Sequence, residues 1–232
     1  MRTSLSVISS MATQKLLAEL VTAYGHVQPG LAVTLSSVGG VDAARRVAAG
    51  EAFDAVVLGA DAIDRLSADG HVLAGSRIDL VRSGVAVAVR AGAMRPDIGS
   101  ESALRQAVLA APTLGYSTGP SGVALGRLFE RWGIAEQVQA KLVVPPPGTP
   151  VGALIARGEV ALGFQQLSEL MHLPGIDVLG PLPDAVQITT VFAGAVVAAS
   201  RQPEAARALL AFLAAPATAA LKRANGMAMA QD

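Results

Sequence analysis

Two spacings of apolar residues alternate along the chain and predict its secondary structure. Short continuous apolar runs, clearest at 54–58 and 84–89, are typical of strands buried on both faces of a sheet. Between these runs, apolar residues recur every three or four positions, as at Leu16, Leu20 and Tyr24, which predicts helices with one buried face. The expected strands are 4–8, 31–36, 54–59, 84–90, 113–116, 141–144, 160–164 and 188–198, and the expected helices are 11–24, 41–49, 60–68, 101–111, 121–132, 149–157, 166–172, 203–214 and 216–225. Such alternation predicts an α/β fold with parallel sheets covered by helices on both faces.

The distribution of apolar runs also indicates how the chain is divided. Long apolar runs lie near 80–90 and 186–198, and the sequence pattern changes after each of them. This change suggests that the chain crosses to a second domain and later returns. The proline-rich segment 145–150 can continue neither a strand nor a helix, so it is expected to be an ordered connector or loop. Two domains are therefore expected, and the alternative is a single doubly wound domain with a proline-rich loop.

Three turns rich in small hydroxyl residues and glycine each precede a predicted helix. They are Ser9-Ser10, the segment 36–40 and the segment 117–122. Each would present the free backbone N–H groups of a helix start next to a serine or threonine hydroxyl, a combination that binds anions without a fixed positive charge. Such serines can equally be ordinary N-caps, each contributing about 1 kcal/mol to stability. Three similar turns in one chain favour a binding site for a small anionic ligand.

Composition excludes several classes of function. Lys plus Arg and Asp plus Glu number 18 each, so no basic field indicates a nucleic-acid partner and no polybasic run indicates a membrane surface. One Trp, two Tyr and five Phe leave few rings for stacking on sugars or bases. The chain has no cysteine, and its three histidines are widely scattered, so neither a metal site nor a cofactor is expected.

Enzyme motifs and targeting segments are equally sparse. The glycines around 119–126 form neither a dinucleotide-binding fingerprint nor a phosphate loop, and the spacing around Ser121 does not match a nucleophile elbow. The first residues lack the pattern of a secretory leader, and the longest apolar stretches are too short to span a bilayer. As written, the chain is expected to be cytoplasmic without membrane insertion, or periplasmic if a leader has been removed.

The order of these motifs resembles the molybdate-binding branch of the type II periplasmic solute-binding proteins. The serine turns after the first two strands are followed by a Gly-acid-Asp run at 50–54 before the third strand and by a crossing strand at 83–87. The resemblance continues through the mid-chain serine-glycine turn, the strand at 156–164 and the closing helices at 211–227. Each motif is weak alone, but their shared order over more than 200 residues is a strong indication of the fold.

The resemblance implies two Rossmann-like lobes joined by two crossing strands, with the ligand in a cleft between them and hinge closure on binding. Lobe one would comprise 1–83 and 192–232, and lobe two 84–191. The crossings would lie side by side at Ser83-Gly84 and around Thr190-Val191. The partners implied are a small anionic ligand and, if the protein is exported, the permease of an ABC transporter.

The residues that match the family's binding positions are drawn from both lobes. Where the family has a tyrosine hydroxyl after the late strand, this chain has Gln165 followed by Gln166, and at the first crossing it carries Arg82, where the family lacks a cation. The expected ligand-binding residues are Ser9, Ser10, Ser36, Ser37, Gly59, Ala60, Arg82, Ser83, Thr118, Gly119, Ser121, Gln165 and Gln166.

The departures from the family pattern bear on the ligand. Neutral donors at helix ends suit a tetrahedral oxyanion, whereas the planar fork of an arginine suits a carboxylate and glutamines add both donors and acceptors. An organic di- or tricarboxylate is therefore favoured over an oxyanion, although Arg82 could also be a surface residue. The chain also resembles relatives that isomerise unsaturated tricarboxylates such as aconitate, and a cytoplasmic ligand sensor is a further alternative.

Overall fold

The chain divides into two compact units. The computed structural model describes residues 3–146 and 148–230. Unit 1 is Met1–Arg82 with Val191–Asp232, and unit 2 is Ser83–Thr190, so each boundary lies one residue before the one expected from the sequence. The expected connector at 145–150 belongs to unit 2, and its residue 147 lies outside the described residues, as do positions 1–2 and 231–232 of the expected lobe one. The chain passes between the units within β4 (Ile78–Arg90) and again within β8 (Thr189–Val196).

The sheet of unit 1 is mixed rather than parallel. β1 (Thr3–Ser10) pairs in parallel with β2 (Leu31–Val38) and β3 (Ala55–Gly59), whereas β3 pairs with β8 in antiparallel orientation. β9 (Ala228–Met229) pairs antiparallel with the first part of β4. The expectation of parallel sheets is therefore wrong for these pairs. The physical reason is that β8 enters the sheet as a returning strand and not through a helical crossover, which is what parallel neighbours require.

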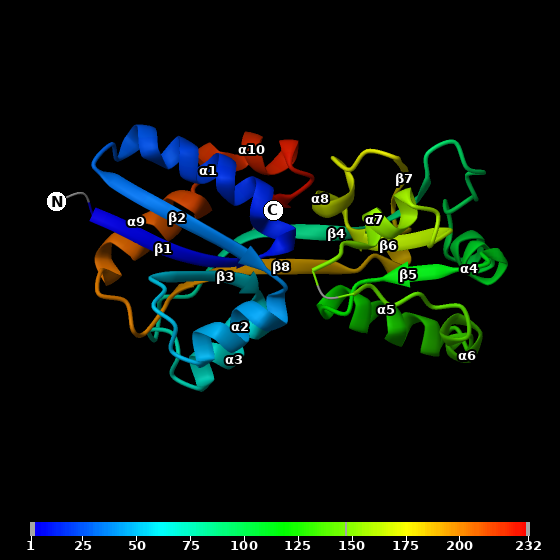
Figure 1. Ribbon diagram of the computed structural model, residues 1–232, viewed down its shortest axis with the longest axis horizontal. Helices are drawn as coiled ribbons and strands as arrows, with labels where there is room; N and C mark the ends of the chain where they lie inside the picture. Colours follow the sequence, from blue (N-terminus) through cyan, green and yellow to red (C-terminus); the bar gives the residue numbers. More distant parts are fainter. Residues whose placement is uncertain (1–2, 147, 231–232) are drawn as a thin grey trace. The chain divides into compact units, whose positions relative to one another are not determined.

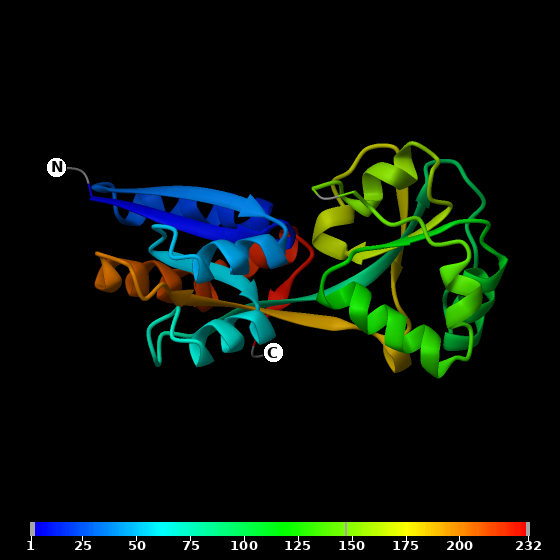
Figure 2. The ribbon, with the colours of Figure 1, turned by 60° about the horizontal axis from the view of Figure 1, so that its bottom comes forward.

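Helices cover both faces of this sheet, as the alternation along its strands predicts. In β3, Ala55 and Val57 contact one apolar cluster, and Val56 and Leu58 contact the other. Figures 1 and 2 show the two layers of helices on either side of the strands. One face is covered by α1 (Gln14–Val27), α9 (Pro203–Ala214) and α10 (Ala219–Ala224), and the other by α2 (Gly40–Ala48) and α3 (Ala60–Ala68).

Unit 2 has a second sheet that is also mixed. β5 (Leu114–Tyr116) pairs in parallel with β6 (Leu162–Gln166), while β4 pairs antiparallel with both β6 and β7 (Ile176–Pro181). β8 lies next to β4, and the Val85 N–H donates to Ile188 O at 3.0 Å. One face is covered by α4 (Glu101–Ala110), α5 (Pro120–Arg131) and α6 (Ala135–Gln139), and the other by α7 (Val151–Ala156) and α8 (Leu167–Leu170).

Most expected elements form close to their expected bounds, and the differences are local. The expected strand at 141–144 is reduced to one bridge between Leu142 and Leu114, because the prolines that follow cannot donate to a ladder. The helices expected at 11–24 and 216–225 each begin with a 3₁₀ turn, η1 (Met11–Thr13) and η3 (Pro216–Thr218). The sequence pattern did not predict α6, β7, β9 or the 3₁₀ turn η2 (Asp184–Val186).

The expected architecture of two α/β lobes joined by two strands is confirmed, although the sheets are mixed and not parallel.

Candidate functional site

The hydroxyl-rich turns of unit 1 lie at one edge of its sheet. β1 is parallel to β2 and β3, so the carboxyl ends of all three strands meet at this edge. Ser9 and Ser37 are register partners there, and their Oγ atoms are 2.8 Å apart. Gly59 is the last residue of β3, and Ala60 is the first of α3. The edge therefore combines serine hydroxyls with helix starts, as the sequence predicted.

The serines of one turn face opposite sides of the sheet. Side chains alternate along a strand, so Ser9 shares a face with its partner Ser37, while Ser10 faces the side that α2 and α3 cover. A Cβ added to Gly40, at the start of α2, would lie 3.8 Å from the Ser10 Cβ. Ser36 is the register partner of Ile8 and faces the same side as Ser10. The four expected serines thus form two pairs, one on each face.

The helix starts at this edge carry no side-chain caps. Ser10 occupies the N-cap position of η1 without a capping hydrogen bond, and its Oγ lies 3.5 Å from Thr13 Oγ1 instead. α2 and α3 both follow a glycine and also lack a side-chain cap. By contrast, Ser100 Oγ at the start of α4 accepts the Ala103 N–H at 3.1 Å. The interpretation of Ser10 as an ordinary N-cap is therefore not supported, whereas Ser100 is one.

In unit 2, the mid-chain turn precedes α5 as expected. Gly119 is the N-cap residue, and Ser121, which is buried within the first turn, has its Oγ 3.2 Å from Ser117 Oγ. Thr118 is exposed. A Cβ on Gly122 would lie 1.6 Å from Ser117 O, so only glycine allows the helix to begin this close to the turn. The close approach of these backbones fixes the two serine hydroxyls next to one another.

Two buried polar side chains beside the crossing strands are incompletely hydrogen-bonded. Gln166 is the register partner of Val85 on β4, and Ser83 lies two residues earlier on the same strand, so both side chains face the side that α5 covers. Gln166 Nε2 donates to Thr190 Oγ1 at 2.8 Å. Ser83 and Gln166 are only 1% and 4% exposed, yet Ser83 Oγ and Gln166 Oε1 have no hydrogen-bond partner within residues 3–146 and 148–230.

Gln165 faces the opposite side of the sheet from Gln166. It is the register partner of Ala86, which packs with α7 and α8. Its Oε1 accepts the Gly152 N–H at 3.2 Å, and its Nε2 donates to Glu169 Oε1 at 2.8 Å. Burial raises the pKa of the Glu169 carboxyl to about 7, although the hydrogen bond from Gln165 acts in the opposite direction. The structure therefore separates the two expected glutamines into different polar groups.

Arg82 is the last residue of unit 1. It lies in β4, is half-buried, and has Ala228 of β9 as its register partner. No acid in the described part of the chain forms an ion pair with Arg82, whereas Arg46 and Arg77 are both paired with carboxylates. Its guanidinium is therefore not committed to a described acidic side chain.

Sequence reasoning missed three residues of these polar groups. Ser117 was recognised only as part of its turn and Thr190 only as part of a crossing, and Glu169 was not considered. The i, i+4 spacing of Gln165 and Glu169 is the signal that could have found the last pair. That spacing is common, and it acquires meaning only once the fold buries Gln165 and half-buries Glu169.

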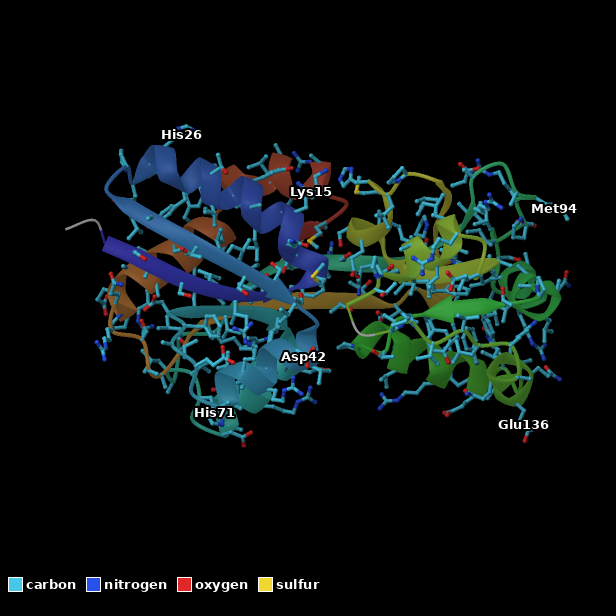
Figure 3. The ribbon with its side chains drawn as sticks, in the orientation of Figure 1. Lys15, His26, Asp42, His71, Met94 and Glu136 are labelled. Carbon is cyan, nitrogen blue, oxygen red and sulfur yellow. The ribbon has the colours of Figure 1, made fainter. Side chains whose placement is uncertain are left out.

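The described residues give little support to metal binding or to membrane insertion. No group of three or more His, Asp or Glu side chains within them could hold a metal ion. His26 and His71 lie at opposite outer sides of unit 1, as Figure 3 shows. No single described helix is long and apolar enough to cross a membrane. Among the described helices, only the pair Pro203–Ala214 and Pro216–Ala224 together has the length and apolar composition of a membrane span, and this pair is bent by 57°.

Comparison with known proteins identifies the family. The family model for the bacterial extracellular solute-binding proteins matches residues 5–228, and the chain therefore belongs to this family. The expected resemblance to type II periplasmic solute-binding proteins is confirmed.

A sequence relative and two solved structures give further detail. An aconitate isomerase from Pseudomonas sp. is 43% identical over 218 residues, which cover 91% of this chain and 82% of the relative. The periplasmic molybdate-binding protein of Azotobacter vinelandii has a TM-score of 0.81 and 18% identity, with 98% of this chain and 100% of that chain covered. The sulfate-binding protein SubI of Mycobacterium tuberculosis H37Rv has a TM-score of 0.79 and 18% identity, with 99% and 88% covered. At such identities the two structures are evidence for the fold alone.

Proposed function

We propose that the chain binds a small organic polycarboxylate of the aconitate class. The observation that carries this proposal is a pair of buried polar atoms in unit 2, Ser83 Oγ and Gln166 Oε1, that find no hydrogen-bond partner among the described residues. Leaving a buried polar atom without a partner costs about 1–3 kcal/mol. A bound ligand that reaches these atoms would remove this cost, so the pair supports a ligand-binding role for this surface.

The hydrogen-bonding capacity of Gln166 favours an organic acid. The hydroxyl of Thr190 can donate or accept, so Gln166 is able to turn either its N–H or its C=O toward a ligand. Fully ionised sulfate and molybdate offer acceptors only. A carboxyl group accepts when ionised and donates only when protonated, so a polycarboxylate that keeps one proton can satisfy both ends of this amide, whereas a fully ionised one, like the oxyanions, can only accept. The relative named aconitate isomerase supports a tricarboxylate in particular.

Unit 1 would contribute neutral donors and one cation. The hydroxyls of Ser9, Ser10 and Ser37 and the uncapped starts of α2 and α3 are suited to an anion. Arg82 adds a planar fork that matches a carboxylate. We propose that these groups of unit 1 also bind carboxylate groups.

Thermal unfolding in the presence of single ligands tests this function. trans-Aconitate, cis-aconitate and the saturated tricarballylate should raise the melting temperature, with about 2.7 kcal/mol of added stability at a hundred times the dissociation constant. Molybdate and sulfate should have little effect. Arg82→Lys should weaken tricarboxylate binding although the charge is kept, whereas Arg127→Lys, on the exposed side of α5, should not. A melting temperature that rises with molybdate or sulfate but not with tricarboxylates would contradict the proposal.

We further propose that ligand binding changes the arrangement of the two units about the crossings at Ser83-Gly84 and Thr190-Val191. The division of the chain at these positions supports this. Small-angle scattering of the protein with and without saturating trans-aconitate measures the change. Profiles that superimpose would contradict a hinge.

A second candidate function is isomerisation of the bound tricarboxylate. The relative at 43% identity carries the name of this activity. Moving a double bond by one carbon requires a proton acceptor, exclusion of water and donors for the developing negative charge, and it requires no cofactor. Incubation of the protein with trans-aconitate should yield cis-aconitate in the proton NMR spectrum. Binding of trans-aconitate without any conversion would leave the binding function and reject the isomerase.

A further inference from the structure

We propose that Glu169 is the group that removes and returns the proton in this isomerisation, an inference that rests on the second candidate function. Glu169 lies on α8, and Gln165 Nε2 donates to its Oε1 at 2.8 Å. Nothing in the sequence pattern marked it for this role. Two structural observations support it, the fixed orientation of Gln165 and the position of α8 in unit 2, and the raised pKa of the carboxyl agrees with them.

The orientation of the Gln165 amide determines which oxygen of Glu169 is available. The Gly152 N–H donates to Gln165 Oε1 at 3.2 Å, and this contact turns Nε2 toward Glu169. Gln165 is only 3% exposed, so its side chain is held by the surrounding packing. Glu169 Oε1 is therefore occupied as an acceptor. The proton is exchanged at Oε2.

Glu169 lies at the edge of unit 2 that carries the other candidate groups. β5 and β6 are parallel, so Ser117, directly after β5, and Gln166, the last residue of β6, lie at the same edge of the sheet. Glu169 follows Gln166 by three residues. Figures 1 and 2 both show α8 and the start of α5 at this end of the unit's sheet. Gln165 and Glu169 lie on the opposite face of the sheet from Gln166, so the ligand has to extend across this edge, past the end of β6, to reach the carboxyl.

The carboxyl is able both to take up and to release a proton near neutral pH. Its pKa of about 7 is caused by burial, and a base works best when its pKa is close to the working pH. α8 packs against β6 and β7. β6 has no ionisable side chain, and the acid of β7, Asp177, accepts the Gly92 N–H at 3.2 Å. His172 follows α8 by two residues.

The proton transfer balances without a redox partner. Oε2 of ionised Glu169 removes a proton from the methylene carbon of the substrate, and the electron pair of the broken C–H bond spreads over the neighbouring double bond and carboxylate. The protonated carboxyl then donates the proton to the far carbon of the former double bond. One C–H bond is broken and one is formed, and the double bond has moved by one carbon.

Proton NMR of trans-aconitate in deuterium oxide tests the role with three proteins. The wild type should exchange the methylene protons and form cis-aconitate, with a rate that inflects close to the pKa of Glu169. Glu169→Gln should lower both rates by about 100-fold or more, while still binding trans-aconitate in calorimetry. The control Glu136→Gln changes an exposed carboxylate on α6 that points away from the unit in Figure 3, and it should behave as the wild type.

A second variant separates proton transfer from a structural role. Gln165→Met removes the hydrogen bond that lowers the pKa of Glu169, so the inflection of the rate should move to higher pH. Equal exchange rates in the wild type and Glu169→Gln would overturn the inference. So would a wild type that binds trans-aconitate but exchanges no proton, and in that case the binding function stands. Failure to bind any tricarboxylate would overturn the proposed function and this inference with it.

Discussion

The polar groups of the two units differ in how their hydrogen-bonding capacity is satisfied. In unit 1, Ser9 and Ser37 hydrogen-bond to each other at the ends of parallel strands, so their hydroxyls are satisfied without a ligand. In unit 2, Ser83 Oγ and Gln166 Oε1 are buried and lack a partner in the described residues. Hydroxyls that already have a partner exchange one hydrogen bond for another when a ligand binds. Unpartnered atoms gain one outright, so unit 2 is expected to contribute more of the binding free energy.

The largest expected effect concerns the turn before α5. Gly122→Ala would bring a Cβ within 1.6 Å of Ser117 O, so the turn and the Ser117–Ser121 contact must move. We expect a loss of about 1–3 kcal/mol in the free energy of unfolding, together with weaker ligand binding. Urea unfolding and calorimetry measure the two quantities.

Gly126→Ala is the matched control for this substitution. Gly126 lies in the same helix, and its Cβ would meet nothing within 4 Å. Alanine there should stabilise the helix by up to about 1 kcal/mol and leave binding unchanged. If both variants behave alike, the turn does not depend on the close approach of Gly122.

Ser83→Ala separates ligand binding from stability. Since Ser83 Oγ has no partner in the described residues, its removal should leave the free energy of unfolding without ligand unchanged or slightly higher. Binding of trans-aconitate should weaken by about 1.5–3 kcal/mol, the usual contribution of a hydrogen bond to a charged group. Calorimetry and urea unfolding on the same preparation test both statements. A clear loss of stability with unchanged affinity would mean that Ser83 has a structural partner and no ligand.

Ser37→Ala tests the expectation that unit 1 contributes less than unit 2 to the free energy of ligand binding. The substitution leaves Ser9 Oγ without its 2.8 Å partner, so stability should fall by about 1 kcal/mol, and affinity should fall less than in Ser83→Ala. Ser100→Ala is the control, because it removes a true N-cap. It should lower stability by about 1 kcal/mol and leave affinity as it was. Affinity that falls more in Ser37→Ala than in Ser83→Ala would reverse the comparison of the two units.

The last expectation is a pH dependence that belongs to unit 2. The pKa of Glu169 is about 7 in the folded protein, against 4.5 for an unperturbed Glu, so folding favours the protonated form. This contribution to stability is present below about pH 4.5 and is lost as the pH rises to about 7. Urea unfolding at a series of pH values should show a shallower decline over this window in Glu169→Gln. An identical pH dependence in the two proteins would contradict the raised pKa.

Local rules explain why so much of the fold could be predicted. Runs of apolar residues and their helical spacing are encoded within a few residues of each other, and α3 and α9 form with the bounds that were expected. The serine-glycine turns were recognisable for the same reason, since a strand end, a small hydroxyl residue and a helix start are consecutive in the chain. The long apolar strands indicated that the chain crosses to a second unit and returns, and the resemblance to the family implied where it does so.

What only the tertiary structure decided depends on partners that are distant in the sequence. Ser37 rather than Ser36 meets Ser9 because the register of β1 and β2 decides which face each side chain occupies. Gln165 and Gln166 are adjacent in the sequence, yet the alternation along β6 directs them to opposite faces and to different partners. The burial that raises the pKa of Glu169 arises where α8 packs against β6 and β7. The sequence determined the helices and strands and the kinds of side chain at their ends. The pairing of strands determined which of those side chains meet, because register and burial arise only when remote segments pack together.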